Sequence, residues 1–173
     1  HKHVIKLYEA VNPSKEKCAH MLEHNLMFFE FCAGGDLLQF VRKRQRISEA
    51  TAQVLFRQII AGIGYLHNKG VIHKDLKLEN ILIDNHGTVK ISSFGNSILT
   101  SQLKDEPYQE PSGNLNYLAP ELLGGRLKNK PLYDHKADIW AAGIMLFVMV
   151  TGQMPLSFNP DKFERNTCDR LDN

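Results

Sequence analysis

The spacing of apolar and polar residues predicts a small amount of sheet near the N-terminus and a mainly helical body after it. Val4–Tyr8 alternates and Leu26–Phe31 is rich in Phe and Leu, so each predicts a strand. The polar segment 12–25 between them contains a proline and predicts a turn. Three further strands are predicted at Val71–Ile72, Ile81–Ile83 and Thr88–Ile91, the last two joined as a hairpin by Asp-Asn-His-Gly.

Helical spacing predicts three helices. Asp36 is placed to cap a short helix that runs to Arg42. Ser48 is placed to cap a longer helix, which Gly70 ends by supplying a left-handed residue. The apolar side chains of this longer helix fall on one stripe: Leu55, Ile59, Ile63 and Leu66. Residues 138–151 are apolar on all sides, which predicts a buried helix.

The remaining segments lack periodicity. Residues 96–116 are polar and rich in Ser, Gln, Glu and Pro, which predicts a long irregular segment of the kind that often carries function. The tail 153–173 contains Pro, Asn and charged residues, and no pattern in it predicts a helix or strand that would cover the core. The expected architecture is therefore α+β.

Composition and charge exclude several classes of protein. Hydrophobic residues make up 43% and charged residues 23% of 173 residues, which suits one globular domain rather than a disordered chain. The net charge of +2 and the lack of a basic run argue against nucleic-acid binding and against a polybasic membrane binder. The longest apolar run, Ile139–Val150, is shorter than the roughly 20 residues that cross a bilayer.

The cysteines point to a reduced environment. An odd number without regular spacing, Cys18, Cys32 and Cys168, does not make a disulfide framework, so we expect an intracellular, cytoplasmic protein. Cys18 lies near His20 and His24, but no second Cys/His cluster completes a metal site. A solvated turn is the favoured interpretation of that segment.

Candidate chemistry is concentrated between a predicted strand and the predicted hairpin, in His73–Asn80. This octapeptide brings together a carboxylate (Asp75), a cation (Lys77) and an amide (Asn80). Phosphoryl transfer uses such groups to accept a hydroxyl proton, to steady a transferring phosphate and to bind Mg²⁺. The alternative is a charged, solvated turn.

Three further motifs follow in order and support the first interpretation. They are Ser93-Phe-Gly95, Ala119-Pro-Glu121 and Asp138-Ile-Trp140. Together with His73–Asn80 they resemble the eukaryotic protein kinase family, and Lys77 resembles its serine/threonine branch. The runs Leu76–Asn80 and Lys136–Gly143 are most similar to the calmodulin-dependent and AMP-activated kinase group.

The resemblance implies a partial protein kinase fold with ATP and Mg²⁺ as cofactors and a protein as substrate or partner. Residues 1–31 would be a remnant of the small lobe, 32–35 the hinge and 36–152 the large lobe. Asp75 would orient and deprotonate the substrate hydroxyl, and Lys77 would steady the γ-phosphate. Asn80 would bind Mg²⁺. The backbone of Glu30 and Cys32 would hydrogen-bond adenine, and Leu82 would pack beneath the adenine ring.

The resemblance also implies structural roles. Leu7, His73 and Phe94 would stack in a buried apolar column, and Asp138 would hold the catalytic loop from below. Glu121 would pair with an arginine from a later helix, which the 173 residues do not supply.

Four departures from the family pattern bear on activity. Ser93 stands where the family has its metal-binding aspartate, and a neutral hydroxyl is a poor Mg²⁺ ligand. Lys74 replaces an arginine, which gives a point charge in place of a bidentate fork, and Asn114 replaces a Thr or Ser. No Gly-x-Gly-x-x-Gly occurs, and the strand lysine of the small lobe is absent.

These departures leave three functional hypotheses. The first is an active serine/threonine kinase, of which this chain, starting at His1, is a piece; the second is a pseudokinase that acts as a binding module. The third is a truncated gene copy that hardly folds. Within 96–118, several hydroxyls could carry a phosphate that pairs with Lys74, namely Thr100, Ser101, Tyr108 and Ser112. An ordinary polar loop is an equally open interpretation.

Overall fold

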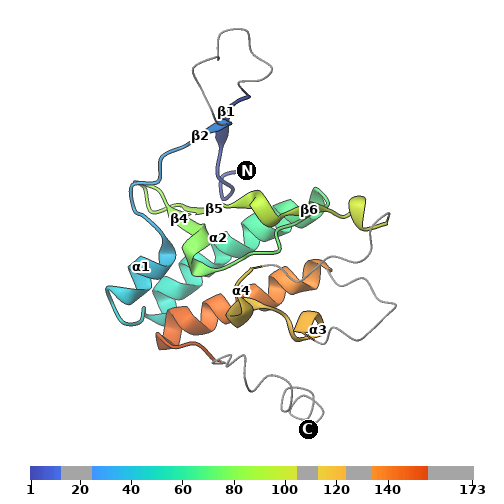
Figure 1. The fold of residues 1–173 in the computed structure, drawn as a ribbon. Coiled ribbons are helices and arrows are strands. Elements are labelled where there is room, and N and C mark those ends of the chain that lie inside the picture. The colour runs from blue at the N-terminus through green and yellow to red at the C-terminus, as the bar shows by residue number, and fades with distance from the viewer. Residues whose placement is uncertain (13–24, 105–112, 124–133, 156–173) are drawn as a thin grey trace.

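Two long antiparallel helices form the centre of the molecule. The computed structural model describes residues 1–12, 25–104, 113–123 and 134–155. The two helices are α2 (Glu49–Asn68) and α4 (His135–Thr151), and they lie side by side in Figure 1. The short α1 (Leu37–Arg42) lies beside them, and α3 (Pro120–Leu123) covers one side of α4.

The first two helices begin and end where the sequence predicts. The Asp36 carboxylate accepts a hydrogen bond from the Gln39 amide at 2.8 Å, and the Ser48 hydroxyl accepts one from the Thr51 amide. Both caps satisfy amides that the helix itself leaves unpaired. Gly70, at φ +69°, then turns the chain out of α2 and into β3.

Within the described residues, the strands form three separate two-stranded antiparallel sheets. The pairs are β1 (Leu7–Val11) with β2 (Leu26–Phe29), β3 (Val71–Ile72) with β6 (Ile98–Leu99), and β4 (Ile81–Ile83) with β5 (Val89–Ile91). Single turns of 3-10 helix lie at Leu78–Asn80, Phe94–Asn96, Gln102–Lys104 and Leu115–Tyr117. The β4–β5 hairpin is confirmed, with Leu82 directly opposite Lys90.

Three strand predictions need correction, and the simplest is that the second strand ends at Phe29 rather than Phe31. The first strand begins at Leu7 rather than Val4, because residues 3–5 bond to β5: the Ile5 amide donates to Ile91 O at 2.8 Å, and the Ile91 amide donates to His3 O at 3.0 Å. Residues 96–116 are also not wholly irregular. Ile98 and Leu99 form β6 because β3 offers them partners 26 and 28 residues earlier in the chain.

Helix α4 begins at His135, three residues before the predicted start. Its first turn is polar, so the apolar pattern does not show it. The predictions that concern Cys18, His20 and His24, the tail beyond residue 155, and Tyr108 and Ser112 fall outside the described residues. None of the described helices combines the length and the apolarity needed to cross a membrane.

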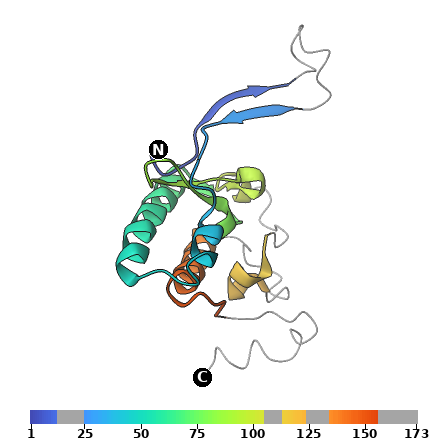
Figure 2. The same ribbon diagram turned by 90° about the vertical axis from the view of Figure 1, so that its left-hand side faces the viewer.

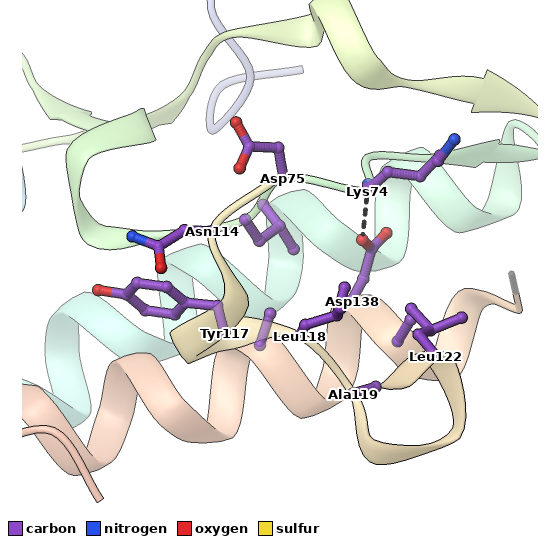
Figure 3. A pocket seen from close by; sticks show the side chains of 11 residues that line it. Lys74, Asp75, Asn114, Tyr117, Leu118, Ala119, Leu122 and Asp138 are labelled. Carbon is purple, nitrogen blue, oxygen red and sulfur yellow. Dashed lines mark hydrogen bonds between the residues drawn. The ribbon is translucent and has the colours of Figure 1, made fainter. Parts of the chain in front are cut away.

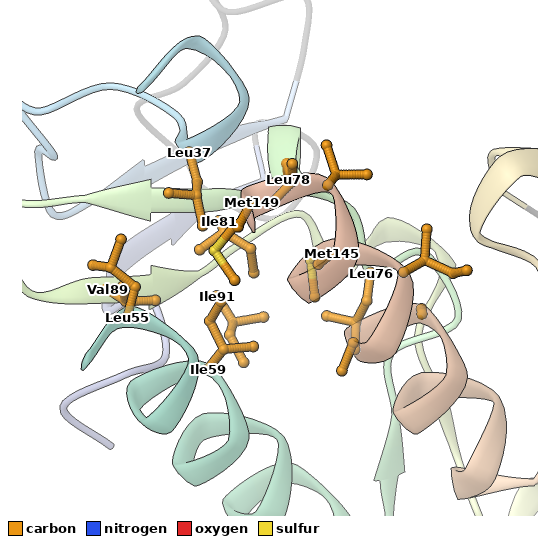
Figure 4. Close-up of a cluster of buried hydrophobic side chains, with 14 of the residues drawn as sticks. Leu37, Leu55, Ile59, Leu76, Leu78, Ile81, Val89, Ile91, Met145 and Met149 are labelled. Atoms are coloured by element: carbon orange, nitrogen blue, oxygen red, sulfur yellow. The ribbon is translucent and has the colours of Figure 1, made fainter. Parts of the chain in front are cut away.

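The hydrophobic core lies between α2, α4 and the β4–β5 hairpin (Figure 4). The predicted stripe of α2 points into it, and so do Met145 and Met149 from α4. Figure 4 shows Ile81, Val89 and Ile91 of the hairpin meeting these helical side chains. The hairpin is therefore anchored on its inner face, which fixes the loops that precede and follow it.

The β1–β2 hairpin projects away from this body (Figure 2). Most of its large apolar side chains are exposed, and Leu7 is 46% exposed. The prediction that Leu7 stacks in a buried column is therefore wrong, because its strand leaves the body before any described element covers it.

Candidate functional site

The predicted catalytic loop places its three polar side chains in contact. The Lys77 ammonium lies 3.0 Å from Asp75 Oδ2, and Asn80 Nδ2 donates to the same oxygen at 3.1 Å. Asn80 Nδ2 also donates to the Asp75 main-chain carbonyl at 2.7 Å. The 3-10 turn Leu78–Asn80 brings Asn80 back toward Asp75, so one short segment builds an acid, a cation and an amide around one point.

Asp138 supports this loop from α4. Its Oδ2 accepts from the His73 amide at 2.9 Å, and its Oδ1 accepts from the Lys74 amide at 3.1 Å. Figure 3 shows the Asp138 carboxylate directly beneath Lys74. His67, at the end of α2, contacts the same carboxylate at 2.8 Å. These bonds hold the loop while Lys74 adopts a left-handed conformation at φ +67°, which is uncommon for a residue other than glycine.

His73 connects the loop to the segment before Ser93. Its ring is fully buried, and Nε2 donates to the Ser92 carbonyl at 2.8 Å while Nδ1 accepts from the Asp75 amide at 3.3 Å. The contact at Nδ1 requires that this nitrogen carry no proton, and burial lowers the pKa of His73. The ring also packs against Phe94, with centroids 5.0 Å apart. Phe94 is half-buried at the edge of the core.

Ser93 is exposed and adopts a left-handed conformation, with φ +66° and ψ +62°. The Mg²⁺ ligands that the described residues offer here are its hydroxyl and the amide oxygen of Asn80, both neutral. Asp75 Oδ2 is already held by Lys77 and Asn80, and its Oδ1 is buried against Gly113. A hard divalent cation prefers carboxylate oxygens, so this donor set does not fit a tightly bound Mg²⁺.

The predicted adenine-contacting residues lie together above the β4–β5 hairpin. Gly34 donates its amide to Ile83 O at 2.8 Å, and the Ile83 amide donates to Gly35 O at 2.9 Å. These two bonds tie the segment that contains Cys32 to the strand that carries Leu82. Leu82 is half-buried, and its neighbours Ile81 and Ile83 point into the core. Leu82 therefore presents its side chain on the opposite face, toward Glu30 and Cys32.

Gly113 approaches Asp75 closely, a contact that the sequence did not reveal. A Cβ on Gly113 would lie 2.8 Å from Asp75 Oδ1, and Gly113 has φ +100°. Among the described residues, Asp75 Oδ1 has no hydrogen-bond partner. A cavity of about 20 Å³, enough for one water molecule, lies between this loop, Tyr117–Ala119 and α4 (Figure 3). Asn114 lines this cavity, and its Oδ1 accepts from the Asn116 amide.

Glu121 is exposed on α3 and borders an apolar groove over α4 with Ile139 and Trp140. Two contributors were missing from the predicted site. They are Gly113 and Lys90, whose ammonium binds the Glu30 carboxylate at 2.9 Å. Neither belongs to a short motif, so only the folded chain reveals them.

Comparison with known proteins agrees with this geometry. The protein kinase domain model matches residues 1–172. The chain is 40% identical over 156 residues to CBL-interacting protein kinase 17 of Oryza sativa subsp. japonica and 38% identical over 157 residues to CBL-interacting serine/threonine-protein kinase 1 of Arabidopsis thaliana. It is 37% identical over 155 residues to NUAK family SNF1-like kinase 1 of Homo sapiens.

Each alignment covers 90% of this chain, but the chain spans only 32%, 32% and 21% of the length of these relatives. The predicted family and its serine/threonine branch are confirmed, and so is the partial kinase-like fold. The chain belongs to the protein kinase family.

Proposed function

We propose that this chain is part of a serine/threonine protein kinase domain, whose reaction moves the γ-phosphoryl group of ATP to a Ser or Thr hydroxyl of a protein. The single observation that supports this proposal is the contact of Asp75 Oδ2 with both Lys77 and Asn80. The proposed layout is a small-lobe remnant at 1–31, a hinge at 32–35 and a large lobe at 36–152.

The proposed chemistry follows from the charges of these groups. The Asp75 carboxylate accepts the proton of the substrate hydroxyl, and such general-base assistance is typically worth about 10²- to 10⁴-fold in rate. The Lys77 ammonium, 3.0 Å from Asp75, offsets negative charge on the transferring phosphoryl oxygens. Asn80 fixes the orientation of Asp75 through two hydrogen bonds.

Binding of the nucleotide is proposed along the segment above Leu82. The adenine would lie on Leu82 and bond to the main chain of Glu30 and Cys32. Protein kinases use ATP with Mg²⁺, and Asn80 would be the family's ligand here. Because Ser93 and Asn80 are both neutral, no step of the proposed mechanism depends on a tightly held metal ion.

Ser93 favours a second candidate function, a pseudokinase that binds a protein partner and transfers phosphate poorly or not at all. Two of the relatives are named for interaction with CBL, so a protein partner is compatible with either candidate. We place both candidates inside the cell, in the cytoplasm, because the cysteine pattern suits a reduced environment.

The test is phosphoryl transfer from labelled Mg-ATP to a Ser/Thr peptide, with Asp75→Asn as the matched variant. Asn keeps the size of the side chain but cannot accept the proton. Labelling that falls at least tenfold in Asp75→Asn supports the kinase. No labelling above that of Asp75→Asn, together with unchanged thermal stability on adding Mg-ATP, favours the pseudokinase.

A further inference from the structure

The Glu30 carboxylate is bound on both sides, although the family resemblance assigns only its main chain to a nucleotide. Its Oε1 accepts from the Lys6 amide at 2.8 Å, and its Oε2 accepts from the Lys90 ammonium at 2.9 Å. The side chains of Lys90 and Glu30 are only 12% and 18% exposed. This ion pair is therefore largely removed from water, unlike the pair of Lys136 with Asp134, whose side chains are 75% and 46% exposed.

Strand register places this ion pair beside the proposed adenine site. Lys90 on β5 is directly opposite Leu82 on β4, and residues opposite each other in an antiparallel pair project from the same face. The Lys90 side chain therefore projects from the same face of the hairpin as the Leu82 side chain. Cys32 lies near the same charges: burial and the Glu30 carboxylate raise the pKa of its thiol, and Lys90 opposes the rise.

The segment between Glu30 and Gly34 is thus fastened at both ends. At one end Glu30 binds Lys90, and at the other end Gly34 donates to Ile83 O at 2.8 Å. Between these ends, Phe31 is 88% exposed, so its side chain contributes no packing that would hold the segment. Two main-chain bonds also reach this segment: the Glu30 amide donates to Lys6 O at 2.9 Å, and the Gly35 amide donates to Cys32 O at 3.2 Å. The Glu30–Lys90 ion pair is what ties the first end of the segment to β5.

We propose that Glu30 and Lys90 are positioning residues. They fix the position of the main chain of residues 30–32 relative to Leu82, so that adenine can bind between them. This inference rests on the proposed nucleotide site and deepens it. It assigns a role to the Glu30 carboxylate and to Lys90, neither of which touches the nucleotide. A buried ion pair whose partner is removed leaves an uncompensated charge, so its loss displaces the segment rather than simply removing one contact.

The test is the dissociation constant for adenosine, which carries no phosphate and is therefore independent of Ser93. Lys90→Met should weaken adenosine binding by about tenfold, a size typical of coupling between contacting residues. Lys90→Arg, which keeps the charge, should stay within about twofold of the wild type. Lys136→Met is the matched control, because its exposed ion pair should contribute almost nothing. Lys90→Met binding as tightly as the wild type, or Lys90→Arg losing as much as Lys90→Met, would overturn the inference.

Amide hydrogen exchange provides a second arm that needs no ligand. In Lys90→Met the amides of Lys6 and Glu30, which donate to Glu30 Oε1 and Lys6 O, should exchange faster, while the amides of α2 stay protected and show that the body is folded. If the wild type binds no adenosine, the proposed nucleotide site fails, and the positioning role is decided by exchange alone. Unchanged exchange at Lys6 and Glu30 would then exclude it.

Discussion

At the residue scale, two buried histidines make the fold sensitive to pH. His73 is fully buried, and His3 is 5% exposed with its Nδ1 donating to Val89 O at 3.1 Å. Burial lowers the pKa of both rings below the usual value of 6.5. His73 orients the catalytic loop and His3 holds the N-terminal segment on β5, and burial disfavours the charged form of each ring.

We predict that the free energy of unfolding falls as the pH falls below about 6.5. In that range His3 and His73 bind more protons in the unfolded chain than in the folded chain, so lowering the pH favours unfolding. Urea denaturation at pH 7.5 and pH 5.5 measures the difference. His3→Gln should flatten the dependence, whereas His86→Gln, which changes an exposed ring, should leave it unchanged. Equal slopes in the wild type and His3→Gln would contradict the prediction.

Serine at position 93 suits neither the left-handed backbone found there nor the binding of Mg²⁺. Its left-handed backbone is one that Asp and Asn adopt more readily than Ser. Aspartate at this position would therefore fit the observed backbone and would add the carboxylate that Mg²⁺ requires. Conformation and metal binding favour the same replacement.

At the element scale, the C-terminal end of α4 depends on a glycine. Gly152 has φ +74° and donates its amide to Val148 O at 2.8 Å, which ends the helix. A Cβ here would collide with the main-chain oxygen of Gln45, in the loop between α1 and α2. The Ile47 amide, which donates to Met149 O at 2.9 Å, ties the same loop to α4.

We predict opposite effects of alanine at two glycines of this region. Gly152→Ala should lower the free energy of unfolding by more than about 1 kcal/mol, because it combines left-handed strain with a main-chain collision. Gly143→Ala, inside α4 with open space around the new methyl group, should raise it by roughly 0.5–1 kcal/mol. Urea denaturation of both variants measures the pair. Equal changes in both would contradict the structural assignment.

Elements governed by local chemistry were predictable from the sequence. Helix α2 has an N-cap at Ser48, one apolar stripe and a glycine stop, and these interactions all span only a few residues. The β4–β5 hairpin likewise follows from its turn residues. The contact of Asp75 with Lys77 and Asn80 also lies within one short loop, so the sequence could suggest it.

Elements governed by distant partners were not predictable in the same way. The two residues of β6 form a strand only because β3 lies beside them, and residues 3–5 leave β1 only because β5 takes their hydrogen bonds. The burial of Leu7 depended on covering elements that the described residues do not supply. The approach of Gly113 to Asp75 also joins positions 38 residues apart, so no local pattern reveals it.

At the scale of the whole molecule, a well-packed body carries a projecting hairpin. The body buries one core shared by α2, α4 and the β4–β5 hairpin (Figure 4). The β1–β2 hairpin has exposed apolar side chains on a two-stranded sheet (Figure 2). An isolated two-stranded hairpin is marginally stable in water, so the two parts should differ in local stability.

We predict that amide hydrogen exchange separates these two parts. Amides of α2 and α4 should be strongly protected, because their opening requires loss of the shared core. Amides paired between β1 and β2 should exchange at least tenfold faster. Fast exchange throughout α4 would contradict the fold and would support the hypothesis of a chain that hardly folds.

The proposed active site brings together segments from three parts of the body. Asp75 and Asn80 come from the loop after β3, Asp138 comes from α4, and Ser93 follows β5. The hydrogen bonds of Asp138 and His73 join these segments. The part of the site that would accept the proton of a substrate hydroxyl, at Asp75, is thus assembled. The part that would bind metal, at Asn80 and Ser93, lacks a carboxylate.

The most direct test of this division is phosphoryl transfer to a Ser/Thr peptide by Ser93→Asp and by the double variant Ser93→Asp/Asp75→Asn. We predict that Ser93→Asp transfers at least tenfold faster than the wild type, because it supplies the missing carboxylate to the metal-binding part of the site. Asp75→Asn in that background should lower the rate by about 10²- to 10⁴-fold. Equal rates with and without the Asp75 carboxylate, or no gain from Ser93→Asp, would contradict the account.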